Sequence, residues 1–495
     1  MTNWHSIAIQ TAAEHGAHEC VELICASNGS VLFGAADRRA RAEAALTSTG
    51  FAAHPGAWLD LIGAVGEPRL LLLGIDGAEP GPDGWLAAGG YLVDAMRALR
   101  VERVRLPRGV DLKGDKAIES LLLGALLHGY SLDQGRRDGG RSVEHRHLVI
   151  DEADRALADA AMRTARAINR ARAWVEQPAN FLTPAVFAEE AGEALERCGV
   201  AVRTLGLAEL EALGVGGLLA VGRASENEPQ LFVAEWRGAP EREGWDAGLV
   251  GKGVTFDGGG LNIKSRPVIE KMKFDMGGAA AVLGALELVA SRNAAINVVA
   301  VVPMAENVID GKGLRPGDVI RSLAGLTVEV ANTDAEGRLL LADGVTYAID
   351  TYHPAAIVDV ATLTGMITGV LHEEYGGFYA SDDQLADELS RAGDATGERL
   401  WRMPLSPAQD YLVESSVADL CNVGASGFLG LGYGSPAAGA KFIERFARGT
   451  PWAHLDIAGT AWATRRTPRS QPGATGFGVA LLDAWIAGLE RRRGV

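Results

Sequence analysis

Charged residues stand beside glycines in two stretches of this sequence that are otherwise strongly apolar. Lys252 lies between two glycines in the run Leu-Val-Gly-Lys-Gly-Val-Thr-Phe, and Asp257 ends that run directly before three more glycines. Further along the chain, Asp334, Glu336 and Arg338 lead into the apolar run Leu-Leu-Leu-Ala. Burying charged side chains costs free energy unless they are paired or bind a ligand. We therefore infer that these residues act on a ligand.

The residue types in the first stretch suggest roles at a metal or a substrate. Lys252 lies in a segment apolar enough to be a central strand, where a lysine loses its proton readily and its neutral amine can ligate a metal. Asp257 precedes Gly258–Gly260, and glycines let the backbone approach a ligand closely. An aspartate in an ordinary turn is the alternative interpretation. Lys264 ends another apolar run and could donate a positively charged hydrogen bond into the same pocket.

Asp334, Glu336 and Arg338 are spaced by two, and this spacing allows two interpretations. If the segment continues an expected strand over Thr327–Ala331, all three side chains project to one side, where two carboxylates repel each other unless a cation lies between them. The alternative is a solvated turn followed by a helix that begins near Leu339, with Glu336 at the helix N-terminus. Taken alone, the spacing favours the turn.

Considered together, the charged residues predict a site for two metal ions. Asp275 precedes an expected helix over Gly277–Ser291, where capping would be its ordinary role. However, three aspartates, one glutamate and a buried lysine suffice to hold two divalent cations. Ions roughly 3.5–4 Å apart can deprotonate a shared water and polarise a carbonyl. Lys264 and Arg338 would remain as cations for the substrate or for developing negative charge.

The strands and helices that position these residues can be expected from an alternating sequence pattern. The second part of the chain has expected strands, separated by helices, near 230–235, 248–255, 297–303, 356–361 and 454–457. This alternation predicts an α/β fold with a mostly parallel sheet flanked by helices. In such sheets, ligands bind beyond the carboxyl ends of the strands. Lys252–Asp257 and Asp334–Arg338 both fall at or just past expected strand ends.

The length of 495 residues favours two domains. The first ~160 residues read as a smaller α/β domain, with a strand over Arg69–Ile75 and a helix over Trp85–Leu99. A long helix pattern over Ala153–Val175 follows, and Thr183 with Pro184 is typical of the start of the next helix. We expect an N-terminal domain, residues 1–160, for support and assembly, and a catalytic domain, residues 161–495.

Composition narrows the class of protein. The formal net charge of −16 argues against a nucleic-acid backbone as the main partner. The four cysteines form no CxxC pair and fit a reducing compartment. Met1–Glu14 lacks the apolar core of a signal peptide, and the apolar run Ile296–Met304 is about half the length of a membrane span. We expect a cytoplasmic protein without a membrane segment.

Several of these motifs resemble the leucyl (cytosol) aminopeptidase family. The resemblance rests on Lys252–Asp257, Lys264, Met272–Gly278 and above all Asn332–Leu341. The octet Asn-Thr-Asp-Ala-Glu-Gly-Arg-Leu, which begins at Asn332, is a highly specific signature of that family. The likeness covers the second half of the chain, whereas the N-terminal part matches only in layout. It implies a two-metal aminopeptidase that releases N-terminal residues from peptides.

The resemblance also implies which residues hold the metals. The tighter ion would be held by Asp257, Asp334 and Glu336, including the Asp334 backbone carbonyl. The more exchangeable ion would be held by Lys252, Asp257, Asp275 and Glu336. The two divalent ions would be manganese or zinc. The neutral α-amine of the substrate would coordinate the second ion beside Asp275, which explains why only N-terminal residues are removed.

The remaining site residues take their roles from the same resemblance. Lys264 would polarise the scissile carbonyl or stabilise the oxyanion, and Arg338 would help bind a bicarbonate ion that relays the proton. Met272 would line the pocket for the first side chain, where a methionine favours leucine-like residues. The peptide would be held by backbone groups of Thr362, Leu363 and Gly365.

Two positions depart from the sequence pattern of the family, and two other functions compete with this interpretation. Gly258 stands where many family members have serine, and Ser265–Lys271 replaces the commoner linker. The family further implies a homohexamer of two stacked trimers. A DNA-binding or regulatory scaffold of the same fold is the alternative function, and the net charge counts against it. An inactive relative is disfavoured, because each of the implied metal ligands is present.

Overall fold

The computed structural model describes residues 4–15, 20–33, 36–64, 67–75, 77, 81–106, 116–132, 146–424, 435–467 and 469–494. Contacts divide the chain into two compact units. The first comprises Met1–Asn169 with Thr464–Pro472, and the second comprises Arg170–Ala463 with Gly473–Val495. Each unit is described by itself.

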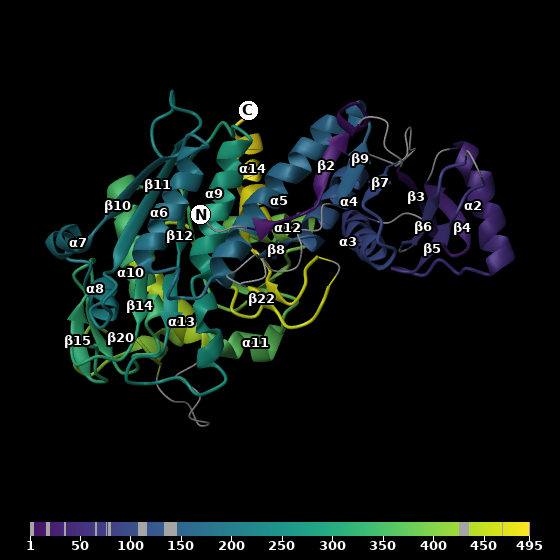
Figure 1. The fold of residues 1–495 in the computed structure, drawn as a ribbon. Coiled ribbons are helices and arrows are strands. Elements are labelled where there is room, and N and C mark those ends of the chain that lie inside the picture. Colours follow the sequence, from purple (N-terminus) through teal and green to yellow (C-terminus); the bar gives the residue numbers. More distant parts are fainter. Residues whose placement is uncertain are drawn as a thin grey trace. The chain divides into compact units, whose positions relative to one another are not determined.

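The first unit is built on a seven-stranded sheet (Figure 1). Its order is β2 (Ala8–Thr11), β9 (His147–Ile150), β7 (Arg103–Arg105), β3 (Val21–Ser27), β6 (Leu70–Gly74) and β5 (Trp58–Leu61), with β4 (Ser30–Phe33) paired to β3. The strands from β2 to β6 are parallel, whereas β5 and β4 pair antiparallel. The sequence predicted β6, and also α3 (Pro82–Ala98), which packs on α4 (Lys116–His128).

The second unit contains a larger, nine-stranded sheet. Its order is β10 (Ala201–Leu205), β11 (Gln230–Arg237), β14 (Asn297–Asn307), β12 (Ala247–Gly251), β17 (Ile357–Ala361), β21 (Trp452–Asp456), β18 (Gly376–Ala380) and β19 (Leu400–Arg402), with β13 (Gly253–Asp257) paired to β14. The central strands β14, β12, β17 and β21 are parallel. The predicted fold class, a mostly parallel sheet flanked by helices, is confirmed for this unit.

Helices cover both faces of the larger sheet (Figure 1). The helix α9 (Gly277–Ser291) packs on β12 so closely that a Cβ on Gly251 would lie 2.7 Å from Ala279 Cα. The helix α10 (Gly337–Tyr352) contacts the side chain of Val250, where a Cβ on Gly344 would lie 2.9 Å from Val250 Cγ1. Because successive strand residues point to opposite faces, α9 and α10 lie on opposite sides of β12.

Further helices complete the two layers of the second unit. The helices α6 (Pro184–Glu196) and α14 (Val479–Arg492) contact α9, and α12 (Asp383–Thr396) contacts α14. The helices α8 (Gly216–Gly222) and α13 (Pro436–Ala447) contact α10. The predicted helix start is confirmed at α6, where Thr183 Oγ1 accepts a hydrogen bond from Val186 N and Pro184 is the first helical residue.

One segment of the second unit is long and apolar enough to cross a membrane by length and composition alone. It is Ile269–Ser291, which joins the 3-10 helix η2 (Ile269–Phe274) to α9, and 89% of its apolar window is buried inside the unit. A buried core helix passes the same test, and α9 is packed on β12 and β17 as a core helix is. The apolar run Ile296–Met304, considered from sequence, lies almost wholly in the buried strand β14.

Candidate metal centre

The strand predicted over 248–255 is interrupted at Lys252. The structure has two strands there, β12 and β13, because Lys252 N donates to Val360 O and Lys252 O accepts from Ala279 N. The break leaves the Lys252 side chain, which is 3% exposed, directed at the N-terminus of α10. A Cβ on Gly337 would lie 2.5 Å from Lys252 Cε, so glycine at this position makes room for the lysine.

The interpretation of Asp334–Arg338 as a continued strand is wrong. The strand β16 (Thr327–Val330) ends before it, residues 333–334 form a turn, and α10 begins at Gly337 with Glu336 as its N-cap. Asn332 Oδ1 accepts from Asp334 N at 2.8 Å, a bond that closes the turn locally. The alternative, a turn before a helix, describes the backbone, but the turn is only partly exposed and the residues after it are buried. Glu336 and Arg338 are 1% and 3% exposed.

Asp275 does not cap α9, although it precedes that helix. The N-cap is Met276, without a side-chain cap bond, whereas Asp275 is 3% exposed and turned into the unit. Asp275 Oδ1 accepts from Thr362 Oγ1 at 2.8 Å, and Asp275 Oδ2 lies 2.7 Å from Lys252 Nζ. The carboxylate is therefore part of the charged cluster.

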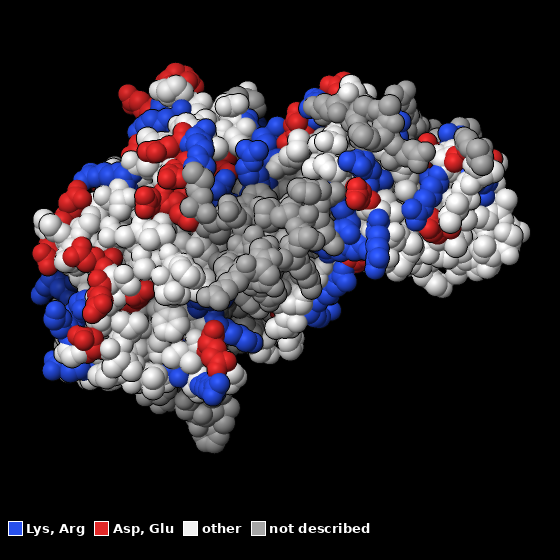
Figure 2. Space-filling view, in the orientation of Figure 1, with Lys and Arg blue, Asp and Glu red and all other residues white. Residues whose placement is uncertain are grey.

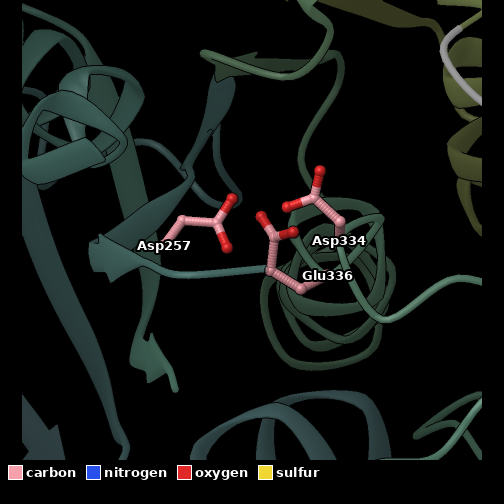
Figure 3. Close-up of side chains that lie close together, drawn as sticks. All are labelled: Asp257, Asp334 and Glu336. Atoms are coloured by element: carbon pink, nitrogen blue, oxygen red, sulfur yellow. The ribbon is translucent and has the colours of Figure 1, made fainter. Parts of the chain in front are cut away.

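Three carboxylates converge from two places in the chain (Figure 3). Asp257 at the end of β13 faces Asp334 and Glu336, and one oxygen from each of the three lies within 4.8 Å of the others. Lys264 Nζ lies 2.8 Å from Asp257 Oδ2 and 2.6 Å from Asp334 Oδ1. Lys252 Nζ, which pairs with Asp275, also lies 2.8 Å from Glu336 Oε1. The five predicted ligands thus form one cluster with Lys264.

The mutual proximity of these charges shifts their pKa values. Burial, then the charges of Asp257 and Glu336, raises the pKa of Asp334 to about 7. Burial alone would raise the pKa of Glu336, but Lys252 and Lys264 outweigh it and hold that pKa below its usual range. These pKa shifts arise because several charged groups lie close together in a buried region, where water screens them poorly.

Two opposing effects act on the pKa of Lys252 in this arrangement of side chains. Burial acts to lower the pKa of Lys252, but Asp275, Glu336 and Asp257 raise it above its usual range. A lysine must be deprotonated to ligate a metal, so a cation that binds at Lys252 has to displace its proton. Metal binding at this position is consequently coupled to proton release.

The cluster fits a divalent cation. Its donors are mainly carboxylate oxygens, which hard divalent cations prefer. Glu336 Oε2 is buried and has no hydrogen-bond partner among the described residues. A ligand oxygen left in this state costs free energy until a cation or a donor approaches it. The residues present therefore suit the ions that the sequence predicts.

The two predicted catalytic cations occupy different environments. The Lys264 side chain is 15% exposed beside Asp257 and Asp334. Arg338 is buried, and its Nη1 donates to Asn422 O at 2.6 Å. Burial lowers the pKa of Arg338 to about 10, so the guanidinium remains charged at neutral pH. Lys264 lies within the cluster, whereas in the described part of the chain the Arg338 side chain makes no ion pair or hydrogen bond with a carboxylate of the cluster.

The predicted peptide-binding segment adjoins the cluster through Thr362. Thr362 O accepts from Lys252 Nζ at 3.1 Å, in addition to the hydroxyl bond to Asp275. Leu363 is half-buried, and Gly365 is exposed at the start of α11 (Gly365–Leu371). Met272 is half-buried in η2, three residues before Asp275. The structure thus brings Thr362 to the cluster and places Gly365 at the surface.

Asp456, which sequence reasoning did not single out, holds this segment in place. It lies at the end of β21 and is 1% exposed. Its Oδ1 accepts from Leu363 N at 3.1 Å, and its Oδ2 accepts from Thr364 N at 3.1 Å and Thr364 Oγ1 at 2.5 Å. The amides of Leu363 and Thr364 are thereby already occupied. A peptide would have to use other groups of the segment.

We expect Asp456→Asn to raise KM for a peptide substrate about five- to 150-fold, since an unpaired buried amide costs roughly 1–3 kcal/mol and would loosen the segment. The metal content should not change. Steady-state kinetics with metal analysis checks this result. Asp359→Asn, which alters a buried aspartate bonded to Trp452 and His454, is the matched control and should leave KM unchanged. Loss of metal in Asp456→Asn would contradict the assigned role.

Buried amide and hydroxyl groups fix the remaining ligands, and sequence reasoning missed their roles. Asn307 Nδ2 donates to Asp257 Oδ1 at 2.8 Å and to Thr333 O at 3.0 Å. Thr333 Oγ1 donates to Gly259 O at 2.7 Å and accepts from Asn262 N at 2.9 Å. Asn307 could have been found, because it ends a strand that is parallel to β12 and β13.

Glycines bring the turn after Asp257 close to these groups. Gly259 has φ of +88°, and a Cβ there would lie 2.8 Å from Asp334 Oδ1. Only glycine suits that backbone conformation and that approach. A Cβ on Gly258 would lie 3.1 Å from Asn307 O, so a serine at this position requires a small shift.

Buried carboxylates and lysines at the carboxyl edge of a mostly parallel sheet are the features of an α/β metallohydrolase. Comparison with known proteins agrees with this class. Residues 169–483 match the catalytic domain of the cytosol aminopeptidase family. The probable cytosol aminopeptidase of Brucella ovis is 42% identical over 435 residues, 85% of this chain and 85% of that protein. The probable cytosol aminopeptidase of Sinorhizobium fredii is 41% identical over 441 residues, 86% and 87% of the two chains.

Solved structures share the whole fold. The cytosol aminopeptidase from Coxiella burnetii has a TM-score of 0.83 and 27% identity, with 97% of this chain and 99% of that chain covered. The bottromycin maturation enzyme BotP in complex with Mn has a TM-score of 0.82 and 33% identity, with 96% and 100% covered. The chain therefore belongs to the cytosol aminopeptidase family. It is a metal-dependent aminopeptidase, a hydrolase that acts on peptides, as the resemblance predicted.

The alternative function, a DNA-binding or regulatory scaffold, is not supported by these comparisons. On the face shown in Figure 2, acidic and basic side chains of the described part of the second unit are interspersed. A phosphate backbone is bound by a surface with a clear excess of Lys and Arg. With a net charge of −16, the protein is poorly suited to that role.

Proposed function

We propose that the cluster is a two-metal centre that removes N-terminal residues from peptides. The observation that carries the proposal is the convergence of Asp257, Asp334 and Glu336 on one point. One ion would be held by these three side chains and the Asp334 carbonyl. The other would be held by Lys252, Asp257, Asp275 and Glu336. The ions, manganese or zinc, would activate a water and polarise the scissile carbonyl.

The chain's own cations would stabilise the charge that develops during hydrolysis. Lys264 is protonated beside two carboxylates that the ions would engage, which leaves its ammonium group free to donate to the substrate carbonyl or the oxyanion. Arg338 is a buried, charged guanidinium that suits a small anion such as bicarbonate, which would relay the proton. No side chain of the cluster then has to act as the general base.

The family resemblance also supports a preference for the first residue of the peptide. Met272 would line the pocket for a leucine-like side chain. Backbone groups of the segment Thr362–Gly365, including Leu363, would hold the peptide, and the substrate amine would coordinate the second ion beside Asp275. The family likeness further supports a cytoplasmic homohexamer, in which the N-terminal domain, residues 1–160, serves support and assembly.

Removal of metal tests this function directly. We expect exhaustive chelation to abolish the release of p-nitroaniline from Leu-p-nitroanilide, because both the attacking water and the carbonyl depend on the ions. Addition of manganese or zinc should restore the activity. Metal analysis before and after chelation is the control for complete removal. Activity that survives in protein shown to be free of metal would refute the proposal.

A further inference from the structure

The turn that carries two of the proposed ligands is bonded to a distant part of the chain. Asn422 follows the short strand β20 (Leu420–Cys421), which pairs in parallel with β16. Asn422 N continues this pairing by donating to Glu329 O at 2.9 Å. The side chain of Asn422 is 0% exposed. It therefore lies in the interior, directly beside the end of β16 where the turn begins.

The Asn422 carboxamide makes four hydrogen bonds, and all four go to backbone groups of the segment that contains that turn. Oδ1 accepts from Ala331 N at 2.9 Å and from Asn332 N at 3.3 Å. Nδ2 donates to Asn332 O at 2.7 Å and to Ala335 O at 3.3 Å. Four bonds to three residues specify the path of the backbone on both sides of Asp334. A side chain with only donors or only acceptors cannot make this set.

The same residue also holds the proposed catalytic arginine. Arg338 Nη1 donates to Asn422 O at 2.6 Å, and the guanidinium is buried. Asn422 thus contacts the backbone next to Asp334 and Glu336 through its side chain, and Arg338 through its main chain. Neither kind of contact makes Asn422 a metal ligand, because its carboxamide atoms are already bonded to the turn.

We propose that Asn422 is a positioning residue, which sets the metal-binding turn in its ligating conformation and aligns Arg338 with it. The proposal rests on the proposed function of the cluster. Loss of a group that orients metal ligands in this way typically lowers metal affinity or activity by about 10–100-fold. Without the four bonds, the turn must find its ligating conformation at the moment the metal binds, at a cost in free energy.

Titration of chelator-treated protein with Mn²⁺ alone tests the proposal. We expect Asn422→Ala to lower the apparent Mn²⁺ affinity about 10–100-fold and to speed Mn²⁺ loss to a chelator in proportion. Excess Mn²⁺ should restore a large part of kcat, while KM for Leu-p-nitroanilide stays near its original value. Asn422→Ser, whose hydroxyl can replace one or two bonds, should be intermediate, and it carries the test if Asn422→Ala does not fold.

Asn297 offers a matched control. Its carboxamide is 1% exposed and equally well bonded, since it accepts from Ala239 N and donates to carbonyls that include those of Ala239 and Gly244. It lies at the opposite end of β14 from Asn307, roughly 30 Å away at 3.3 Å per strand residue. Asn297→Ala should lower Tm by an amount similar to Asn422→Ala and leave Mn²⁺ affinity unchanged.

The outcomes separate this proposal from the function on which it rests. Wild-type Mn²⁺ affinity in Asn422→Ala or Asn422→Ser, with only Tm reduced, would overturn the positioning role. An equal loss of affinity in Asn297→Ala would overturn it as well, because general destabilisation would then explain the effect. If Asp257→Asn binds as much Mn²⁺ as the unaltered chain, the two-metal centre itself is refuted.

Discussion

Asp257→Asn is expected to remove bound metal and to reduce activity to background. The substitution conserves the size of the side chain but removes its charge, and Asp257 is, with Glu336, one of the two proposed ligands that both ions share. Asp257 Oδ2 lies 2.8 Å from Lys264 Nζ, while Oδ1 accepts from Gly259 N and Asn307 Nδ2. An amide in this position would direct its NH₂ group at Lys264 or at the ions, and neither arrangement is favourable.

Metal stoichiometry after purification and dialysis, measured together with peptidase activity, checks this expectation. Asp343→Asn is the matched control. Asp343 is likewise 1% exposed, but it accepts from the backbone amides of Gly217, Leu218 and Leu323 and not from the cluster. This control should lower Tm and retain metal. If Asp257→Asn retained two ions per subunit, the proposed ligand set would be wrong.

Lys264→Ala is expected to retain the metal and to lose turnover. A donor aimed at a developing oxyanion contributes on the order of a hundredfold or more to kcat. The lysine lies 2.6 Å from Asp334 and is partly exposed, so it can reach both the proposed ligands and solvent. Bound ions would compensate the carboxylates after its removal, which is why metal content should persist. Arg338→Ala should likewise retain the metal and lose turnover.

The measurement is kcat at saturating metal, accompanied by metal analysis. Lys441→Ala serves as the control, because Lys441 is 3% exposed and pairs with Asp410 and Glu444 outside the cluster. Its kcat should equal that of the unaltered enzyme. A Lys264→Ala variant with unchanged kcat would exclude a catalytic role for this lysine, and one without metal would assign it to the metal site.

The chemistry of the cluster could be predicted from sequence because it depends on residue type and on local pattern. Asp257 and Lys252 were identifiable as charges inside a run that periodicity marks as a buried strand. The helix α9 has the bounds predicted for it, Gly277–Ser291, since its apolar residues directly follow the two glycines that begin it. The position of the charges at the carboxyl edge of a parallel sheet follows from the alternation of strands and helices.

Other features depend on partners that the local sequence does not contain. The conformation of Asn332–Glu336 is a half-buried turn because Asn422 bonds it from outside and Thr333, within it, bonds to Gly259. Residues with a spacing of two would fit a strand equally well. The pKa of Lys252 is raised, against the effect of burial, because Asp275 and Glu336 reach it from other segments.

The sequence by itself therefore determined the family, the fold class and the candidate metal ligands and catalytic cations. These depend on residue identity and short-range periodicity. Only the tertiary structure decided where the strand breaks at Lys252, which backbone amides Asp456 occupies and what Asn422 holds. These contacts join positions about 90 residues apart, as in the Asn422–Asn332 pair. Contacts between residues so far apart in the sequence depend on the packing of the whole sheet. Neither segment alone carries a sequence pattern that predicts them.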